Sequence, residues 1–276
     1  MSCGNRPLAV VTGASGGIGR AICLRLATEG YNLVAQYLSR YDNAESLRAE
    51  LEVLGAHCTL VACDLSEPNA IDAVDAVVER TMQVTGSELT ALVNSAALLL
   101  GPSFNDATQE QFDTFMAVNL RAPFFMTQRL SLRMPPGGAV VNLSSAGAHF
   151  SSPGDIVYSM GKAALESMSF HAAESLATRG IRINSVIPGF TDNGHALFSV
   201  PEARAHMSSH AIMGDIADPA TVAEAVLFLL SDRSSRTTGS TLDVSGGSTL
   251  GVRVRSADKI SLRALQNRPI TSKRLN

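Results

Sequence analysis

Tyr158 and Lys162 form the pair of side chains in this sequence whose types and spacing most directly indicate chemistry. They stand four positions apart in a segment of helical character that runs to Gly180, so both lie on one helix face. An ammonium beside a phenol favours the phenolate, so we expect the tyrosine pKa to fall from its ordinary ~10 toward neutrality. The pair then provides a general acid for carbonyl reduction, or a general base for the reverse reaction. Such spacing also occurs in ordinary surface helices, so the interpretation depends on the rest of the chain.

A glycine-rich turn stands near the start of the chain. The apolar run 8–11 is typical of a buried strand, and a helical segment ending at Gly30 follows the turn Thr-Gly-Ala-Ser-Gly-Gly-Ile-Gly. Small residues let the backbone approach a pyrophosphate, and the helix N-terminus stabilises its charge. This order favours a dinucleotide site at Gly13, Gly17 and Gly19, with a glycine turn that binds no ligand as the alternative.

The second expected strand is 32–36, and the residues that follow it indicate which dinucleotide binds. A carboxylate usually stands there to bind the ribose hydroxyls, but this chain has no acid at that place and carries Ser39 and Arg40 instead. A guanidinium and a hydroxyl suit a 2′-phosphate, so the pattern favours NADP, as NADPH in reduction, over NAD. Arg40 as a plain surface residue is the alternative.

The composition is that of an ordinary soluble globular protein, with 276 residues of which 45% are hydrophobic and 17% charged. No apolar stretch approaches the ~18 residues of a membrane span, and no N-terminal signal is visible, so we predict a cytoplasmic protein with no membrane partner. The four cysteines have neither metal-ligand nor redox spacing, which indicates reduced thiols. The histidines have no ligand spacing either, so no metal site is predicted.

Charge is distributed unevenly along the chain. The formal net charge is -3, yet seven Lys and Arg residues and a single acid follow residue 252. We therefore divide the chain into a catalytic domain, 1–252, and a basic C-terminal tail, 253–276. No aromatic residue interleaves the basic ones, which favours a solvated terminus over binding to nucleic acid, anionic lipid or a neighbouring subunit.

Short apolar runs alternate with helical segments along the chain, which predicts a parallel sheet covered on both faces. Pro123, inside a long helical segment, predicts a kink or a local break there. The expected strands are 8–11, 32–36, 58–62, 89–93, 138–143, 181–187 and 241–244. The expected helices beyond those after the glycine turn and around Tyr158 are 44–54, 70–82, 109–133 and 221–230.

Together these motifs resemble the classical short-chain dehydrogenase/reductase family over about nine tenths of the chain. The glycine turn and the pair Tyr158 and Lys162 match two family motifs. The serine that the family places about a dozen residues before the tyrosine matches Ser145, and its helix asparagine matches Asn119. The acid that follows the third strand, near the adenine, matches Asp64. Five such features, in the order that the family has and each on the expected element, rarely occur together by chance.

The resemblance implies an α/β fold, a single-domain doubly wound Rossmann fold whose parallel seven-stranded sheet has helices on both faces. It also implies that Ser145 binds the substrate carbonyl oxygen and that Tyr158 gives this oxygen its proton. Lys162 would lower the tyrosine pKa and bind the nicotinamide ribose, and Asn119 would hold a water that links the lysine to solvent. A homo-oligomer, either a tetramer or a dimer, is implied as well.

The resemblance further implies the cofactor-binding residues and shows three departures from the family pattern. Ala97 stands where a glycine is usual, Asn193 where a threonine is usual, and Gly16 where many NADP-preferring members carry a basic residue. The implied set is Gly13, Ser15, Gly17, Ile18, Gly19, Ser39, Arg40, Asp64, Leu65, Asn94, Ala96, Tyr158, Lys162, Pro188, Gly189, Thr191 and Asn193.

The residues that meet the substrate are less visible in the sequence. The family lines its pocket with segments that match 97–100, 146–156 and 190–218 here, and Ala97, His149 and Phe150 are the candidate contacts. Their largely apolar character predicts a neutral, hydrophobic ketone or the matching secondary alcohol. We expect 190–218 to form a lid, and Ser144 to serve only the backbone turn. His149 as a solvated loop residue is the alternative.

Two other functions stay open at this point. One is an NAD-dependent secondary alcohol dehydrogenase, and the other is a non-catalytic nucleotide-binding regulatory protein. Intact Asn119, Ser145, Tyr158 and Lys162 argue against the second, because a site without turnover has no physical need for all four.

Overall fold

Seven parallel strands form one sheet in the order β3-β2-β1-β4-β5-β6-β7. The computed structural model describes residues 6–194 and 196–250, so Cys3, His195 and the predicted basic tail lie outside the described residues. The strands are β1 (Leu8–Val11), β2 (Asn32–Tyr37), β3 (Cys58–Ala62), β4 (Leu89–Asn94), β5 (Ala139–Leu143), β6 (Arg182–Pro188) and β7 (Thr241–Val244). The predicted seven-stranded parallel sheet is confirmed.

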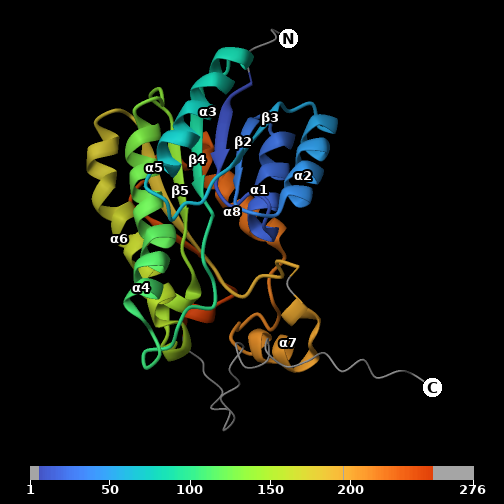
Figure 1. Cartoon of the computed structure of the whole chain (residues 1–276), viewed down its shortest axis with the longest axis vertical. Coiled ribbons are helices and arrows are strands. Elements are labelled where there is room, and N and C mark those ends of the chain that lie inside the picture. The colour runs from blue at the N-terminus through green and yellow to red at the C-terminus, as the bar shows by residue number, and fades with distance from the viewer. Residues whose placement is uncertain (1–5, 195, 251–276) are drawn as a thin grey trace, which may run out of the picture.

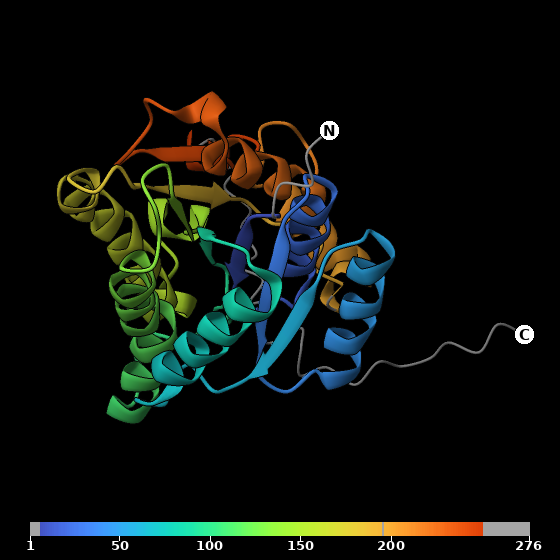
Figure 2. The ribbon, with the colours of Figure 1, turned by 90° about the horizontal axis from the view of Figure 1, so that it is seen from above.

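Helices cover both faces of this sheet (Figure 1 and Figure 2). Successive residues of a strand point to opposite faces, so Val10 and Val11 belong to two different cores. The core that includes Val11 packs under α1 (Gly17–Thr28), α2 (Tyr41–Val53) and α8 (Pro219–Leu230). The core that includes Val10 packs under α3 (Ala70–Thr85), α5 (Ala122–Ser131) and α6 (Ile156–Ala177). Within the described residues, no helix is long and apolar enough to cross a membrane.

The strand order reverses between β1 and β4, so the loops that follow these two strands diverge to opposite faces. In open parallel sheets, ligands bind in the crevice that this reversal creates at the carboxyl ends of the strands. The glycine turn follows β1, Asn94 ends β4, and Ser145 follows β5 closely. The fold therefore brings the predicted site residues to one edge.

The long helical segment before β5 is interrupted. Helix α4 (Gln109–Met116) begins with a capping box between Thr108 and Gln111, and the stretch Ala117–Arg121 is a π-helical turn before α5. Pro123 lies in the first turn of α5, where its missing N–H removes a helical hydrogen bond. The predicted break is confirmed, and it places Asn119 inside the π-helical turn, a feature often found at functional sites.

The segment after β6 folds as a small unit of its own. It contains the 3-10 turn Ala196–Ser199 and helix α7 (Pro201–Ser208), which lies apart from the two helical layers (Figure 1). Thr191 and Ala217 pair at its two ends, and Leu197, Ala203, Met207 and Ile216 form its core. The described residues of the predicted lid segment, 190–194 and 196–218, therefore form a structure that closes back on itself.

Candidate active site

Ser145 and Tyr158 meet where β5 ends beside the first turn of α6. Ser145 is the cap of the 3-10 turn Ala146–His149, and its Oγ accepts a hydrogen bond from the Gly147 N–H at 3.1 Å. The Ser145 and Tyr158 side chains border the same space, since a Cβ at Gly147 would lie 3.4 Å from the Ser145 Oγ and 3.8 Å from a ring carbon of Tyr158. The two residues predicted to contact the substrate oxygen are thus together.

Lys162 lies one turn farther along α6 and is almost fully buried, with 2% of its surface exposed. Its Nζ donates a 2.6 Å hydrogen bond to the carbonyl oxygen of Leu143 and lies 5.7 Å from the centroid of the Tyr158 ring. Burial disfavours the charged form and lowers the pKa of Lys162 to about 8. The lysine therefore still carries most of its charge at pH 7.

The prediction that the Tyr158 pKa falls toward neutrality is wrong for this structure. Burial raises the pKa of Tyr158 to about 12, and the neighbouring Ser145 hydroxyl, which acts in the opposite direction, only partly offsets this. The ammonium of Lys162 lies over the ring and donates to the Leu143 carbonyl, so removal from water dominates. The phenol is protonated at neutral pH, the state a proton donor requires.

Asn119 uses its side chain to hold a loop. Its amide accepts from the Leu98 N–H at 2.9 Å and donates to the Leu98 carbonyl at 3.1 Å, and no part of the residue is exposed. Gly161 of α6 packs here, since a Cβ at Gly161 would lie 3.2 Å from the Asn119 Cβ. Asn119 thus joins the loop after β4 to α6, while its predicted water-binding role stays a prediction.

The loop that Asn119 holds borders Tyr158. Leu100 has a φ of 56°, in the left-handed region that a residue with a Cβ occupies at a cost of roughly 1 kcal/mol. A Cβ at Gly101 would lie 3.5 Å from the backbone nitrogen of Tyr158. The predicted pocket residue Ala97 therefore begins a strained loop that runs beside the catalytic tyrosine.

The glycine turn packs against other loops of the chain, in addition to its predicted contact with a dinucleotide. A Cβ at Gly13 would lie 2.8 Å from the Ala96 Cα, and one at Gly17 would lie 2.6 Å from the Asn193 Cα. A Cβ at Gly19 would lie 2.3 Å from the Gly13 oxygen. Thr12 adds to this assembly, because its Oγ1 accepts from the Ala96 N–H at 3.0 Å. Loops after β1, β4 and β6 thus form one unit, with Ser15 and Ile18 half-buried in the turn.

Gln36 is a site residue that the sequence argument missed. Its buried side chain accepts from the Gly13 N–H at 2.9 Å and donates to the Cys63 carbonyl at 2.8 Å. One amide thus joins β2 to the loops after β1 and β3. An amide at the end of β2, where an acid is usual, was the available signal.

The residues expected around the adenine end are exposed at the same edge. Ser39 and Arg40 follow β2, both exposed, and within the described residues the Arg40 guanidinium has no hydrogen bond or ion pair. Asp64 is half-buried and accepts from the Ser66 N–H at 2.8 Å, while Leu65 is buried. An uncommitted guanidinium beside a hydroxyl fits a 2′-phosphate.

Three other predicted cofactor residues make hydrogen bonds or packing contacts with other parts of the chain. The Asn94 side chain is buried and donates to Asn142 at 2.8 Å, so only its backbone faces the crevice. Gly189, after Pro188, packs on the loop after β7, because a Cβ there would lie 2.6 Å from the Ser245 oxygen. The Thr191 hydroxyl donates to the Gly189 carbonyl at 3.1 Å.

The structure separates the two predicted substrate residues of the segment after Ser145. His149 turns to α6, where its Nε2 lies 3.0 and 3.1 Å from the two carboxylate oxygens of Glu166. Phe150 lies against the lid segment, with its ring centroid 5.6 Å from that of His210. His210 also lies 5.3 Å from the ring of Phe190 and 4.8 Å from that of His206. These four residues form what we call the aromatic cluster.

Comparison with known proteins agrees with this geometry. A family model described as enoyl-(acyl carrier protein) reductase matches residues 13–249. The 3-oxoacyl-[acyl-carrier-protein] reductase FabG of Staphylococcus aureus is 32% identical over 241 residues, which cover 87% of this chain and 96% of that protein. The solved structure of the angucycline C-6 ketoreductase LanV with bound NADP is 40% identical, with a TM-score of 0.86, and covers 90% of this chain and 98% of its own.

A second ketoreductase is similar over the same span. The promiscuous reductase LugOII, which catalyses keto-reduction at C1 during lugdunomycin biosynthesis, is 38% identical with a TM-score of 0.85. The match covers 88% of this chain and 98% of that one. These likenesses extend over the whole sheet and its helices.

Proposed function

Because the chain belongs to the short-chain dehydrogenase/reductase family, we propose that it reduces a neutral, hydrophobic ketone to a secondary alcohol with NADPH. The observation that carries this proposal is that the Ser145 and Tyr158 side chains border one space beside the buried Lys162. A protonated phenol with a serine hydroxyl beside it is suited to receive a carbonyl oxygen.

The chain's own residues orient the substrate and supply the proton. When bound, the cofactor supplies the hydride. Ser145 donates a hydrogen bond to the carbonyl oxygen, and Tyr158 transfers its proton to that oxygen as the alcohol forms. Lys162 keeps a positive charge 5.7 Å from the tyrosine ring centroid and so stabilises the phenolate left behind. Solvent then returns the proton to the tyrosine.

NADPH fits the residues at the carboxyl edge better than NADH does. Arg40 and Ser39 are free to bind the 2′-phosphate, and the N-terminus of α1 faces the place of the pyrophosphate. The relatives crystallised with NADP support the same choice. Gly13, Gly17 and Gly19 would bring the backbone close to the phosphates.

The substrate we propose is a ketone with a flat, apolar ring system. The aromatic cluster of Phe150, Phe190, His206 and His210 joins two segments that line the pocket in the family. LanV is described as an angucycline ketoreductase and has been crystallised with rabelomycin, which supports a substrate of related shape. Flat rings stack well on such side chains.

Two measurements test this function. Fluorescence titration with NADPH and NADH is expected to show tighter binding of NADPH, and turnover is expected on cyclic aromatic ketones. Tight nucleotide binding without turnover on any ketone or alcohol would favour a regulatory protein. Faster oxidation of secondary alcohols with NAD would favour a dehydrogenase.

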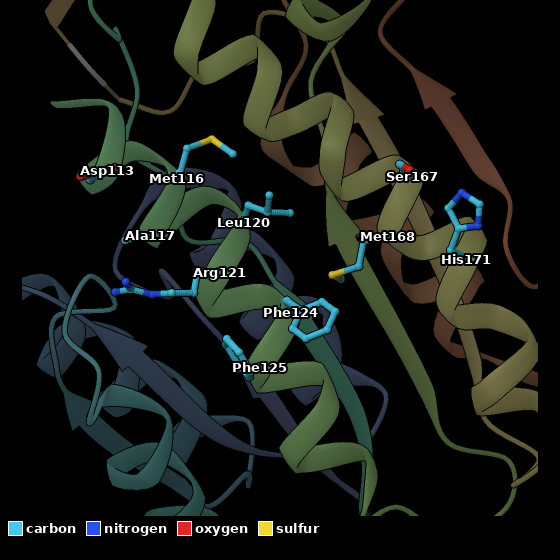
Figure 3. Close-up of a pocket in the computed structure, with 10 residues that line it drawn as sticks. All are labelled: Asp113, Met116, Ala117, Leu120, Arg121, Phe124, Phe125, Ser167, Met168 and His171. Carbon is cyan, nitrogen blue, oxygen red and sulfur yellow. The ribbon is translucent and has the colours of Figure 1, made fainter. Parts of the chain in front are cut away.

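We also propose that the protein forms a homo-oligomer, a dimer or a tetramer, through the outer face of α5 and α6. A groove of about 580 Å³ lies there, and Figure 3 shows Phe124 and Met168 facing one another across it. Asp113 and Arg121 also line this groove. A two-fold interface must complement itself, and a patch that carries both an acid and a base around apolar residues can do so.

Sedimentation analysis tests the oligomer. Phe124→Glu is expected to shift the protein to a smaller species, because it places a charge in the apolar patch. Val53→Glu is the matched control, since Val53 is an exposed apolar residue of α2 on the other face. A monomeric wild-type protein would contradict the proposal. Cytoplasmic localisation also stays our proposal from the sequence.

A further inference from the structure

We infer that Glu166 is a positioning residue for the reaction, because its carboxylate holds both ends of the turn that carries Ser145 against helix α6. Glu166 lies on α6 one turn beyond Lys162 and two turns beyond Tyr158, so all three share one face of the helix. The inference rests on the proposed reductase activity and adds to it a residue that positions the catalytic side chains.

Three consecutive residues at the end of β5 contact these three helix positions. The Leu143 carbonyl accepts from the Lys162 ammonium at 2.6 Å. The Ser144 hydroxyl donates to the Glu166 carboxylate, and the Ser145 side chain lies beside that of Tyr158. The strand end and the helix are therefore joined by hydrogen bonds at two points one helical turn apart, with Ser145 and Tyr158 side by side one turn before them. This fixes the helix both along its axis and in its rotation relative to Ser145.

The carboxylate also holds the far end of the turn. His149 lies 3.0 Å and 3.1 Å from its two oxygens, and His149 is the last residue of the 3-10 turn that Ser145 begins. Ser144 precedes Ser145, so the two residues bound by Glu166 flank the catalytic serine on both sides. A short turn held at both ends leaves its first side chain little freedom.

The strength of these contacts follows from their surroundings. Ser144 is buried, and only 16% of the Glu166 side chain is exposed. Hydrogen bonds to an ionised carboxylate in such a setting are stronger than neutral ones. The Ser144 hydroxyl also lies 3.1 Å from the Lys162 carbonyl, so the same cluster touches the backbone of the catalytic lysine. Loss of the carboxylate would therefore loosen Ser145, while the Lys162 ammonium stays held by the Leu143 carbonyl.

The test compares Glu166→Ala and Glu166→Gln with the control Glu174→Ala. Glu174 is an exposed glutamate farther along the same helix. Glu166→Ala is expected to lower kcat roughly tenfold to a hundredfold, because small misplacements of reacting groups are costly, with NADPH binding unchanged. Glu166→Gln is expected to recover most of kcat, since its amide oxygen still accepts from Ser144. Glu174→Ala is expected to behave as wild type.

Hydrogen exchange gives a second measurement that does not depend on turnover. Amides of residues 144–149 are expected to exchange faster in Glu166→Ala than in wild type, while those of β1 do not. Should Glu166→Ala fail to fold, Ser144→Ala removes one of the same contacts and is expected to lower kcat in the same way. The inference is overturned if the folded variants keep wild-type kcat, or if kcat and NADPH affinity fall together. Failure of the wild-type enzyme on every ketone would instead overturn the proposed function.

Discussion

The catalytic corner at β5 and α6 and the aromatic cluster after β6 are built from different forces. In the corner, Ser145 and Lys162 are placed by directional hydrogen bonds of 3.1 and 2.6 Å, and Lys162 is almost fully buried. In the cluster, rings such as those of Phe190 and His210 meet at centroid distances near 5 Å and stay half-buried. Directional contacts suit a proton transfer, whereas ring contacts suit a substrate surface that adjusts its shape. Variants in the two regions should therefore affect different kinetic constants.

Replacing the tyrosine should have the largest effect and should be independent of the substrate. Tyr158→Phe removes the proton donor, and general acid catalysis is worth about 10²–10⁴-fold, so kcat should fall by that factor on every ketone. NADPH affinity by fluorescence titration should stay within about twofold. Tyr31→Phe, at the amino end of β2, is the control. A loss of kcat that differs from one ketone to another would mean that the catalytic corner does not act alone in the chemistry.

The buried lysine should make stability depend on pH. The pKa of Lys162 falls from 10.5 to about 8 in the folded protein, so between these values the unfolded chain binds the proton and the folded chain does not. Wild-type stability should therefore rise with pH across this window, by up to about 3 kcal/mol. Lys162→Met lacks this dependence, so the difference in stability between the two proteins, measured by denaturation at pH 7 and pH 10, should change. A difference that is constant with pH would contradict the burial of a charged lysine.

Replacing Arg40 should change the preference between NADPH and NADH and leave the catalytic corner unaffected. Arg40→Ala should weaken NADPH binding roughly tenfold or more, because a charged hydrogen bond to the 2′-phosphate is lost, and should leave NADH binding unchanged. Parallel titrations with both nucleotides measure this. Arg80→Ala, an exposed arginine on α3, is the control. An unchanged preference would place the phosphate site elsewhere.

The smallest change should come from the aromatic cluster, and it should be selective. His210→Ala removes three ring contacts, each worth about 0.5–1.5 kcal/mol, so KM for flat aromatic ketones should rise several-fold. KM for a small aliphatic ketone should stay the same. His57→Ala, an exposed histidine beside β3, is the control. Equal effects on both ketones would mean that the cluster does not bind the substrate.

Local patterns were sufficient to predict the elements of the fold. Apolar runs bounded by glycine or polar residues located all the strands, and Pro123 located the break before α5. The helix boundaries were less accurate, because α2 begins at Tyr41 and α8 at Pro219, both ahead of the expected starts. Helix starts depend on caps such as Asp218, which accepts from the Ala220 N–H, and such contacts are weak signals in a sequence.

The site was predicted less evenly than the fold. Ser145, Tyr158 and Lys162 came together as expected, because their places follow from a strand end and a helical spacing. His149, which stays a candidate substrate contact, also contacts Glu166, and Ser144, expected only in a backbone turn, donates its hydroxyl to the same carboxylate. Both outcomes depend on α6 packing beside β5, which residue types alone do not reveal.

The sequence by itself determined the order of strands and helices, the glycine turn and the spacing of Tyr158 and Lys162. These features depend on residues within a few positions of one another, so local rules suffice. Only the tertiary structure decided the pKa of Tyr158, the link from Gln36 to Gly13 and the cluster around Glu166. Burial and hydrogen bonding in these cases join residues that are distant in the chain, and the packed fold alone sets which of them meet.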